Sequence, residues 1–236
     1  MRAGVILQAR MGSTRLPGKV LEPVGAWSIL EHCVRRLRAG GHSVIVATTT
    51  GSADDAIARD ATRMGADVFR GHETDVLGRY RAAAHAFELT HVVRATADNP
   101  FVDGEGVSRT LAFLTRVGAD HVVECGLPVG AAVEAVTRDA LDRAATLVTD
   151  PYDSEHVTSF IRRDDRFRAL RAVVNGKVRR PGLRLTVDTP EDLAFVRTVH
   201  EALGAPETVV PLEAVIAAAE ACLAPGAARP RIRQGA

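Results

Sequence analysis

The chain has 236 residues, 46% hydrophobic and 25% charged, a composition typical of a globular protein long enough for one α/β domain. The net charge is only +1, and one Trp, two Tyr and seven Phe are too few for a basic surface with stacking rings, so we expect no nucleic-acid partner. Three separated cysteines, Cys33, Cys125 and Cys222, without a CxxC pair argue against disulfides or structural zinc and fit a reducing compartment. With no signal-peptide core and no apolar run of spanning length, we expect a cytoplasmic protein without membrane contact.

The first half of the chain alternates short β-branched runs with amphipathic helical patterns, which is typical of a parallel sheet with crossover helices. Capping-box patterns at Ser28 and Ser52 each predict the start of a helix. Two further helices are expected over residues 74–87 and from 103 to about 116. Strands are expected at residues 5–9, 44–48, 67–69, 91–95 and 120–123.

The second half is less regular, and it contains a segment rich in Gly and Pro at residues 126–130. Strands are predicted at residues 133–136, 170–174 and 183–187, and helices at 139–148, 154–163, 189–203 and 211–223. The resulting expectation is an α/β fold of three layers, Rossmann-like, with a mostly parallel central sheet and a small irregular insertion. We expect a single domain over residues 1–223 and a flexible tail over 224–236.

The loop directly after the first strand carries three cations within ten residues, Arg10, Arg15 and Lys19, together with two glycines and two hydroxyls. It is predicted to lie at the carboxyl end of a parallel strand, where the ligands of such sheets bind. Gly12 would let backbone amides approach phosphate oxygens, while the cations would supply forked donors and a point charge. The glycine spacing differs from a P-loop, and no G-x-G-x-x-G occurs. We interpret the loop as an anion site; the alternative is a solvated basic surface loop.

Two acids follow predicted strands, Asp98 after the strand at 91–95 and Asp188 after the strand at 183–187. Carboxylates at strand ends point into the ligand crevice and suit Mg²⁺, which prefers oxygen ligands and keeps some of its waters. The alternatives are an ordinary Asp-Asn-Pro turn at Asp98 and a helix cap at Asp188. The next helix already has a cap in Thr189, completed by Asp192 as a capping box, so we assign Asp188 to the metal.

Together these segments resemble the cytidylyltransferases that activate acidic sugars, the CMP-Kdo synthetase superfamily, and most closely its spore coat polysaccharide-type branch. The resemblance rests on ordered matches at residues 9–19, 47–49, 71, 75–80, 94–100, 128–130, 134, 154–158 and 184–192. It implies the nucleotide-diphosphosugar transferase variant of the three-layer fold. It also implies transfer of CMP from CTP to a small acidic acceptor, release of pyrophosphate, Mg²⁺ as cofactor, and a homodimer formed through the less regular second half.

The same resemblance assigns roles to individual residues. The catalytic cations would be Lys19, Arg10 and Arg15, and the metal ligands Asp98 and Asp188. The nucleotide-binding residues would be Ala9, Arg10, Gly12, Ser13, Thr14, Arg15, Lys19, Thr48, Gly71, Asp75, Val76, Arg79 and Asp98. The acceptor-binding residues would be Arg94, Glu134, Glu155, His156 and Arg184.

One departure from the branch concerns the acceptor side. The branch usually has Arg before Glu-His-Val, whereas Ser154 stands here, so the acceptor is expected to be a sugar acid, a phosphonate or another small anion. His156 is interpreted as a proton shuttle, as a hydrogen-bond donor to the acceptor substrate, or as a structural residue.

Two other functions compete with cytidylyl transfer. A nucleotide-sugar-dependent glycosyltransferase would normally have an Asp-x-Asp motif, which is absent at Asp98, and a non-catalytic nucleotide-binding module would not need Lys19, Asp98 and Asp188 together.

Overall fold

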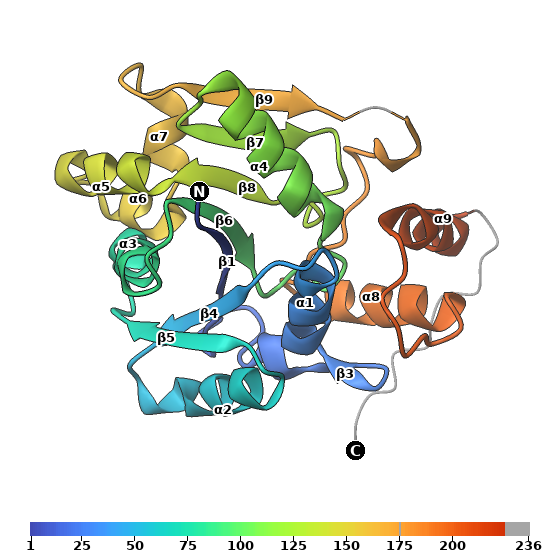
Figure 1. Cartoon of the computed structure of the whole chain (residues 1–236). Helices are drawn as coiled ribbons and strands as arrows, with labels where there is room; N and C mark the ends of the chain where they lie inside the picture. Colours follow the sequence, from blue (N-terminus) through green and yellow to red (C-terminus); the bar gives the residue numbers. More distant parts are fainter. Residues whose placement is uncertain (175, 225–236) are drawn as a thin grey trace.

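The structure is a computed structural model that describes residues 1–174 and 176–224; the predicted tail lies outside these residues beyond Ala224. Its middle layer is a sheet of seven strands among the described residues, in the order β5-β4-β1-β6-β8-β7-β9 (Figure 1). Neighbouring strands are parallel except β8, which runs antiparallel to β6 and β7, so the predicted mostly parallel sheet is confirmed. The strands are β1 (Ala3–Gln8), β4 (Val44–Thr49), β5 (Asp67–Gly71), β6 (His91–Thr96), β7 (His121–Cys125), β8 (Glu134–Thr137) and β9 (Ala169–Val173).

Helices cover both faces of the sheet and complete the three-layer α/β fold (Figure 1). On β1, Val5 and Leu7 enter one core and Ile6 enters the other, because successive strand side chains point to opposite faces. The first core includes residues of α1 (Ile29–Arg38), α2 (Asp55–Arg63), α4 (Glu105–Val117), α8 (Pro190–Ala202) and α9 (Leu212–Leu223). The second includes residues of α3 (Val76–Ala86), α5 (Arg138–Leu147) and α7 (Ser159–Arg163), and α6 (Pro151–His156) packs beside α3. Within the described part of the chain, no helix combines the length and apolarity needed to cross a bilayer.

Short elements that the sequence pattern does not reveal connect β1 to α1. They are the 3-10 turn η1 (Lys19–Leu21) and a hairpin of β2 (Pro23–Val24) and β3 (Trp27–Ser28). The hydroxyl of Ser28 then accepts the backbone N–H of Glu31 at 3.2 Å and caps α1, as the capping pattern predicts. Lys19 therefore lies at the start of a 3-10 turn, and the β2–β3 hairpin connects this turn to the capped helix α1.

Two helical predictions are wrong in detail. The pattern at Ser52 predicts a cap, but Ser52 opens a 3-10 turn, η2 (Ser52–Asp54), without a capping side-chain bond, and α2 begins after it. The carboxylate of Asp54 instead accepts bonds from Met11 in the loop after β1 and from Thr48 and Thr49 at the end of β4, which holds the chain in the tighter turn. The helix predicted at 154–163 consists of α6 and α7, separated by Val157 with a φ of 51°.

The strand predicted at 183–187 is also wrong as a sheet strand. This segment is extended but makes only an isolated parallel bridge, between Val129 and Arg184, within the described residues. The bridge does not extend into a ladder because the chain turns at Gly130, with a φ of 93°, and the Ala131 N–H donates to the Pro128 carbonyl at 3.0 Å instead of to this segment. The segment nevertheless places Asp188, the residue that follows it, at the edge of the sheet, because the Val187 N–H donates to the Asp98 carbonyl.

A histidine pair joins the β2–β3 hairpin to two helices. His32 of α1 is 4% exposed and donates from Nε2 to the Val24 carbonyl at 2.8 Å. Its ring centroid lies 5.3 Å from that of His200 in α8. Burial lowers the pKa of His32 to about 4, and the positive charges of His200 and Arg36 act in the same direction against the opposing bond to Val24.

This depressed pKa predicts that stability falls as the pH drops from about 6.5 towards 4, because the unfolded imidazole binds a proton in that window and the folded one does not. The full loss is about 3 kcal/mol, since each pKa unit corresponds to about 1.4 kcal/mol. Urea unfolding at pH 7, 6 and 5 measures it. His32→Gln, which keeps a donor for Val24, should flatten the dependence; equal slopes for both proteins would contradict the assignment.

Candidate functional site

The loop after β1, the end of β6 and the segment before α8 meet at the carboxyl edge of the sheet. Between them lies a cavity of about 310 Å³, which we call the phosphate cavity. The loop after β1 contributes a glycine, two hydroxyl side chains and three cationic side chains to its lining, as the anion-site interpretation requires. The lining residues are Gln8, Ala9, Arg10, Gly12, Ser13, Thr14, Arg15, Lys19, Val20, Thr96, Ala97, Asp98, His156 and Asp188.

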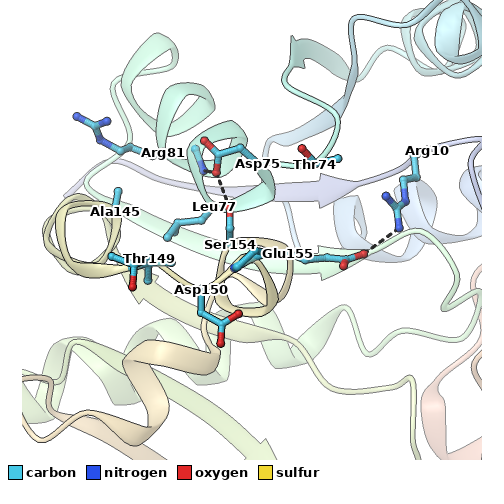
Figure 2. A pocket seen from close by; sticks show the side chains of 13 residues that line it. Arg10, Thr74, Asp75, Leu77, Arg81, Ala145, Thr149, Asp150, Ser154 and Glu155 are labelled. Atoms are coloured by element: carbon cyan, nitrogen blue, oxygen red, sulfur yellow. Dashed lines mark hydrogen bonds and ion pairs between the residues drawn. The ribbon is translucent and has the colours of Figure 1, made fainter.

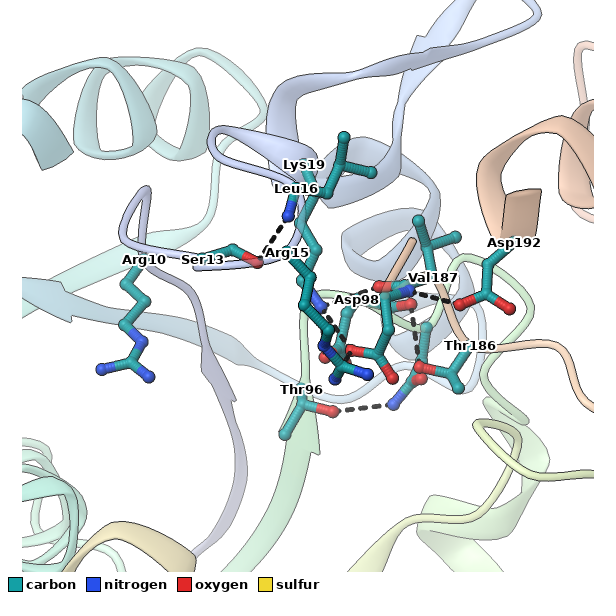
Figure 3. Close-up of polar contacts among 12 residues, drawn as sticks. Arg10, Ser13, Arg15, Leu16, Lys19, Thr96, Asp98, Thr186, Val187 and Asp192 are labelled. Carbon is teal, nitrogen blue, oxygen red and sulfur yellow. Dashed lines mark hydrogen bonds and ion pairs between the residues drawn. The ribbon is translucent and has the colours of Figure 1, made fainter. Parts of the chain in front are cut away.

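Lys19 lines the cavity and joins the three segments (Figure 3). Its ammonium donates to Asp98 Oδ2 at 3.0 Å, to Asp188 Oδ1 at 2.9 Å and to the Val187 carbonyl at 2.7 Å. The Lys19 side chain is 11% exposed, so these three acceptors satisfy a largely buried cation. The two carboxylates, far apart in the sequence, therefore converge on one positive charge.

Asp188 is enclosed by cations. Arg15 contacts its Oδ1 at 3.1 Å, and Arg184 donates to its Oδ2 at 2.6 Å. Burial would raise the pKa of Asp188, but the bonds from Lys19 and Arg184 and the charges of Lys19 and Arg15 together lower it, so the carboxylate stays ionised. The alternative interpretation of Asp188 as a cap is wrong, because Thr189 caps α8 in a capping box.

A close backbone approach holds Asp188 in place. The N–H of Val187 donates to the Asp98 carbonyl at 2.8 Å, which ties the segment before α8 to the end of β6. Gly130 lies against this junction, where an added Cβ would stand 2.8 Å from Thr186 and from the amide oxygen of Asn99. Any side chain at position 130 would therefore push the two acid-bearing segments apart.

Asp54 fixes the loop after β1, a role that the sequence reasoning missed by interpreting this region as a helix cap. It is 3% exposed and accepts the Met11 N–H at 2.8 Å, the Thr48 hydroxyl at 2.9 Å and the Thr49 N–H at 3.0 Å. Burial alone would raise the pKa of Asp54, but these donors lower it below its ordinary value. The sequence signal that could have indicated this role is that Asp54 is the first acid after Thr48 and Thr49, which lie at the end of the predicted strand.

Asp54→Asn is expected to lower the free energy of unfolding by about 1–3 kcal/mol, because the amide nitrogen would face a donor and leave it unsatisfied. Asp55→Asn is the matched control: Asp55 is the adjacent acid, its side chain is 46% exposed, and its ion pair with Arg70 should contribute at most about 1 kcal/mol. Denaturant unfolding of both variants measures the difference. Equal losses would contradict the role of Asp54.

A second, larger cavity of about 630 Å³ adjoins the first and lies between α3, α5 and α6 (Figure 2). Arg10 lines both cavities, and it contacts Glu155 at 3.0 Å. Ser154 donates to Asp75 Oδ1 at 2.8 Å, and Asp75 also caps α3 by accepting the Gly78 N–H. Side chains of α6 therefore bridge to the loop after β1 and to the start of α3.

The other residues predicted to bind the nucleotide lie outside the lining of the cavities, and all but Gly71 are buried. Thr48 is fully buried and bonded to Asp54, and Val76 belongs to the second core. Arg79 is 1% exposed and bonds to the His72 and Glu73 carbonyls. Gly71 packs against Arg79, where a Cβ would meet its side chain at 3.0 Å. None of Thr48, Gly71, Val76 and Arg79 lines either cavity, so a nucleotide role for them stays a prediction.

The residues predicted to bind the acceptor do not form one cluster. His156 lines the phosphate cavity, Glu155 lines the larger one, and Arg184 contacts Asp188 and Asp192. Arg94 and Glu134 are paired at 2.9 Å in the interior and line neither cavity. An acceptor role for these five residues stays a prediction.

The two acids at Lys19 fit a hard divalent cation. Asp98 and Asp188 direct oxygen atoms to one point that already holds positive charge. Within the part of the chain that the structure describes, no group of three or more His, Cys, Asp or Glu side chains could hold a metal. Mg²⁺ is usually bound by one or two carboxylates, together with water and substrate phosphates. Two carboxylates beside a loop rich in cations and hydroxyls therefore suit Mg²⁺ better than a metal such as zinc that needs four protein ligands.

Comparison with known proteins shows several relatives. The profile of a family described as Cytidylyltransferase matches residues 4–209. The spore coat polysaccharide biosynthesis protein SpsF of Bacillus subtilis (strain 168) is 33% identical over 207 residues, covering 84% of this chain and 86% of that protein. A solved cytidylyltransferase from Leptospira borgpetersenii has a TM-score of 0.81 at 28% identity and covers 94% of each chain. A CMP:2-keto-3-deoxy-manno-octonic acid synthetase complexed with CTP has a TM-score of 0.65 at 18% identity, covering 85% of this chain and 99% of that one.

Proposed function

The chain belongs to the cytidylyltransferase family, and we propose that it transfers CMP from CTP to a small acidic acceptor with release of pyrophosphate. The observation that carries the proposal is the ammonium of Lys19 shared by Asp98 and Asp188, beside a loop that carries Arg10 and Arg15. This arrangement gathers the positive charge that a triphosphate needs and the carboxylates that a divalent ion needs.

In the proposed reaction an acceptor oxygen forms a bond to the α-phosphorus of CTP, and the bond from that phosphorus to the oxygen of the leaving pyrophosphate breaks. Asp98 and Asp188 would hold Mg²⁺, which when bound neutralises charge on the phosphate oxygens. Lys19 and Arg15 offer fixed donors where negative charge increases, and no covalent enzyme intermediate is needed. Arg10 sits where the two cavities meet and can orient either substrate.

The acceptor is proposed to be a sugar acid or a phosphonate. Ser154 replaces the cation usual at this position in the branch, and its hydroxyl bonds to Asp75 instead of facing the phosphate cavity. The cations lining the phosphate cavity, Arg10, Arg15 and Lys19, would then have to serve the acceptor anion as well as the triphosphate. A compact acceptor with one acidic group meets that condition better than one with several.

Pyrophosphate release tests the proposal directly. The full chain would be incubated with each of the four nucleoside triphosphates, with Mg²⁺ at increasing concentration, and with a panel of sugar acids and phosphonates. The expected result is pyrophosphate formation that needs CTP, one class of acid and Mg²⁺. Transfer from a nucleotide sugar without pyrophosphate release would indicate the glycosyltransferase instead, and CTP binding without turnover on any acid would indicate a non-catalytic module.

A further inference from the structure

The chain makes an unusual turn immediately after His156. Val157 has φ 51° and ψ −62°, and the N–H of Thr158 donates to the His156 carbonyl at 2.5 Å. This is a three-residue γ-turn with positive φ, a rare and strained conformation, and strain is greatest for a β-branched residue such as valine. Such a conformation persists only where the surrounding structure imposes it, and it occurs preferentially at functional sites.

The residues after His156 are anchored in the interior. The side chain of Val157 is fully buried in the second core, and Thr158 is fully buried as well. The Thr158 hydroxyl donates to Glu134 Oε2 at 2.6 Å, and α7 begins at the next residue. His156 itself is exposed, so its position depends on this anchored turn and on the contact of its ring with Tyr152, 4.2 Å away between centroids.

Glu134 is in turn fixed by two other strands. Its Oε1 accepts from Arg94 of β6 at 2.9 Å, and its Oε2 contacts Nε2 of His121 of β7 at 2.7 Å. With Thr158 added, both carboxylate oxygens are occupied. Because neither Glu134 nor Arg94 lines a cavity, Glu134 is held in place to accept from Thr158 and has no free oxygen for a ligand.

We propose that Glu134 is a positioning residue: acting through Thr158, it holds the strained turn at Val157 that presents His156 to the phosphate cavity, where His156 contacts the acceptor. The inference rests on the proposed function for the acceptor. In this proposal Glu134 does not bind the acceptor directly. The buried group of Arg94, Glu134 and His121 instead acts on the reaction through the position of His156.

Thr158→Val tests the link, because it removes the hydroxyl with little change of shape. We expect kcat for CMP transfer to fall about tenfold, as misplacing a substrate-contacting group by a fraction of an ångström does. Thr158→Ser should restore it. Thr110→Val is the matched control, since Thr110 is 1% exposed and its hydroxyl bonds within α4, to the Gly106 carbonyl. In a His156→Ala background, Thr158→Val should cause no further loss; additive losses would overturn the proposal.

A second measurement does not depend on activity. In protein labelled with ¹⁵N-histidine, the ring signals of His156 should shift or broaden in Thr158→Val and stay unchanged in Thr110→Val and Thr158→Ser. Unchanged His156 signals in Thr158→Val would overturn the positioning role even if CMP transfer is found. Absence of CMP transfer in the wild-type chain with every acid would overturn the proposed function and leave this measurement to decide whether Glu134 positions the turn.

Discussion

Replacing Lys19 with Ala should lower kcat/KM for CMP transfer by at least about 10²-fold, the effect typical of losing one preorganised charge that faces developing negative charge. Lys19 is the shared partner of Asp98 and Asp188, so the variant also leaves two neighbouring carboxylates without the cation between them. Their mutual repulsion adds to the loss by moving them from the geometry that suits a metal. Steady-state kinetics of pyrophosphate release measure the change.

Lys177→Ala is the matched control for this prediction, because Lys177 has the same side chain but is exposed and pairs with Glu213 at the surface. It should retain normal turnover, since exposed ion pairs contribute little. Thermal unfolding of both variants shows whether the fold survives. Near-normal turnover of a folded Lys19→Ala protein would contradict the role given to the loop after β1.

The second large effect concerns stability. Glu134→Leu should lower the free energy of unfolding by about 3–5 kcal/mol, because removing one partner of a buried ion pair leaves the other uncompensated. Arg94, with a side chain 17% exposed, would keep its charge with no acid beside it. Burial would raise the pKa of Glu134, but the charge of Arg94 and the bonds from His121 and Thr158 hold it well below its usual range. This contribution to stability is therefore present above the unfolded carboxyl pKa near 4 and is lost as the pH falls.

Glu124→Leu is the control, since Glu124 is equally buried but bonds to Arg109, whose side chain is 40% exposed and can be hydrated instead. Its cost should be nearer about 1–2 kcal/mol. Adding Arg94→Met to Glu134→Leu should recover the part of the loss that comes from the unpaired charge of Arg94, whereas the bonds to His121 and Thr158 stay lost. Denaturant unfolding of the four proteins tests this pattern. A double variant as unstable as Glu134→Leu would contradict it.

Local sequence patterns were sufficient for features encoded by neighbouring residues. The alternation of strands and helices predicts the parallel sheet, and the acids at strand ends predict that Asp98 and Asp188 approach the loop of Lys19. The capping box at Thr189 is likewise local, and the structure contains it. For Asp98 the reason is that a strand of a parallel sheet carries the residue after it to the carboxyl edge. Asp188 reaches the same edge from an extended segment outside the sheet, so its place was predicted correctly from a strand that does not form.

Features that depend on pairing between distant segments could not be predicted. The antiparallel register of β6 and β8 places Arg94 opposite Glu134, and only that register explains why a charged pair lies in a buried sheet. Asp54 illustrates the same limit, since its partner Met11 lies in another loop 43 residues earlier. The break at Val157 escapes detection because its cause is the anchoring of Thr158 to a strand of the sheet, while the local sequence favours helix.

The contacts of Lys19 also have a kinetic meaning. Its two acids are 79 and 169 positions away along the chain, so these contacts close only after most of the polypeptide has folded. Contacts of such long range form late, because the intervening chain must first give up its freedom. During refolding from denaturant, circular dichroism should thus recover before turnover does, and catalysis would report the final step of assembly.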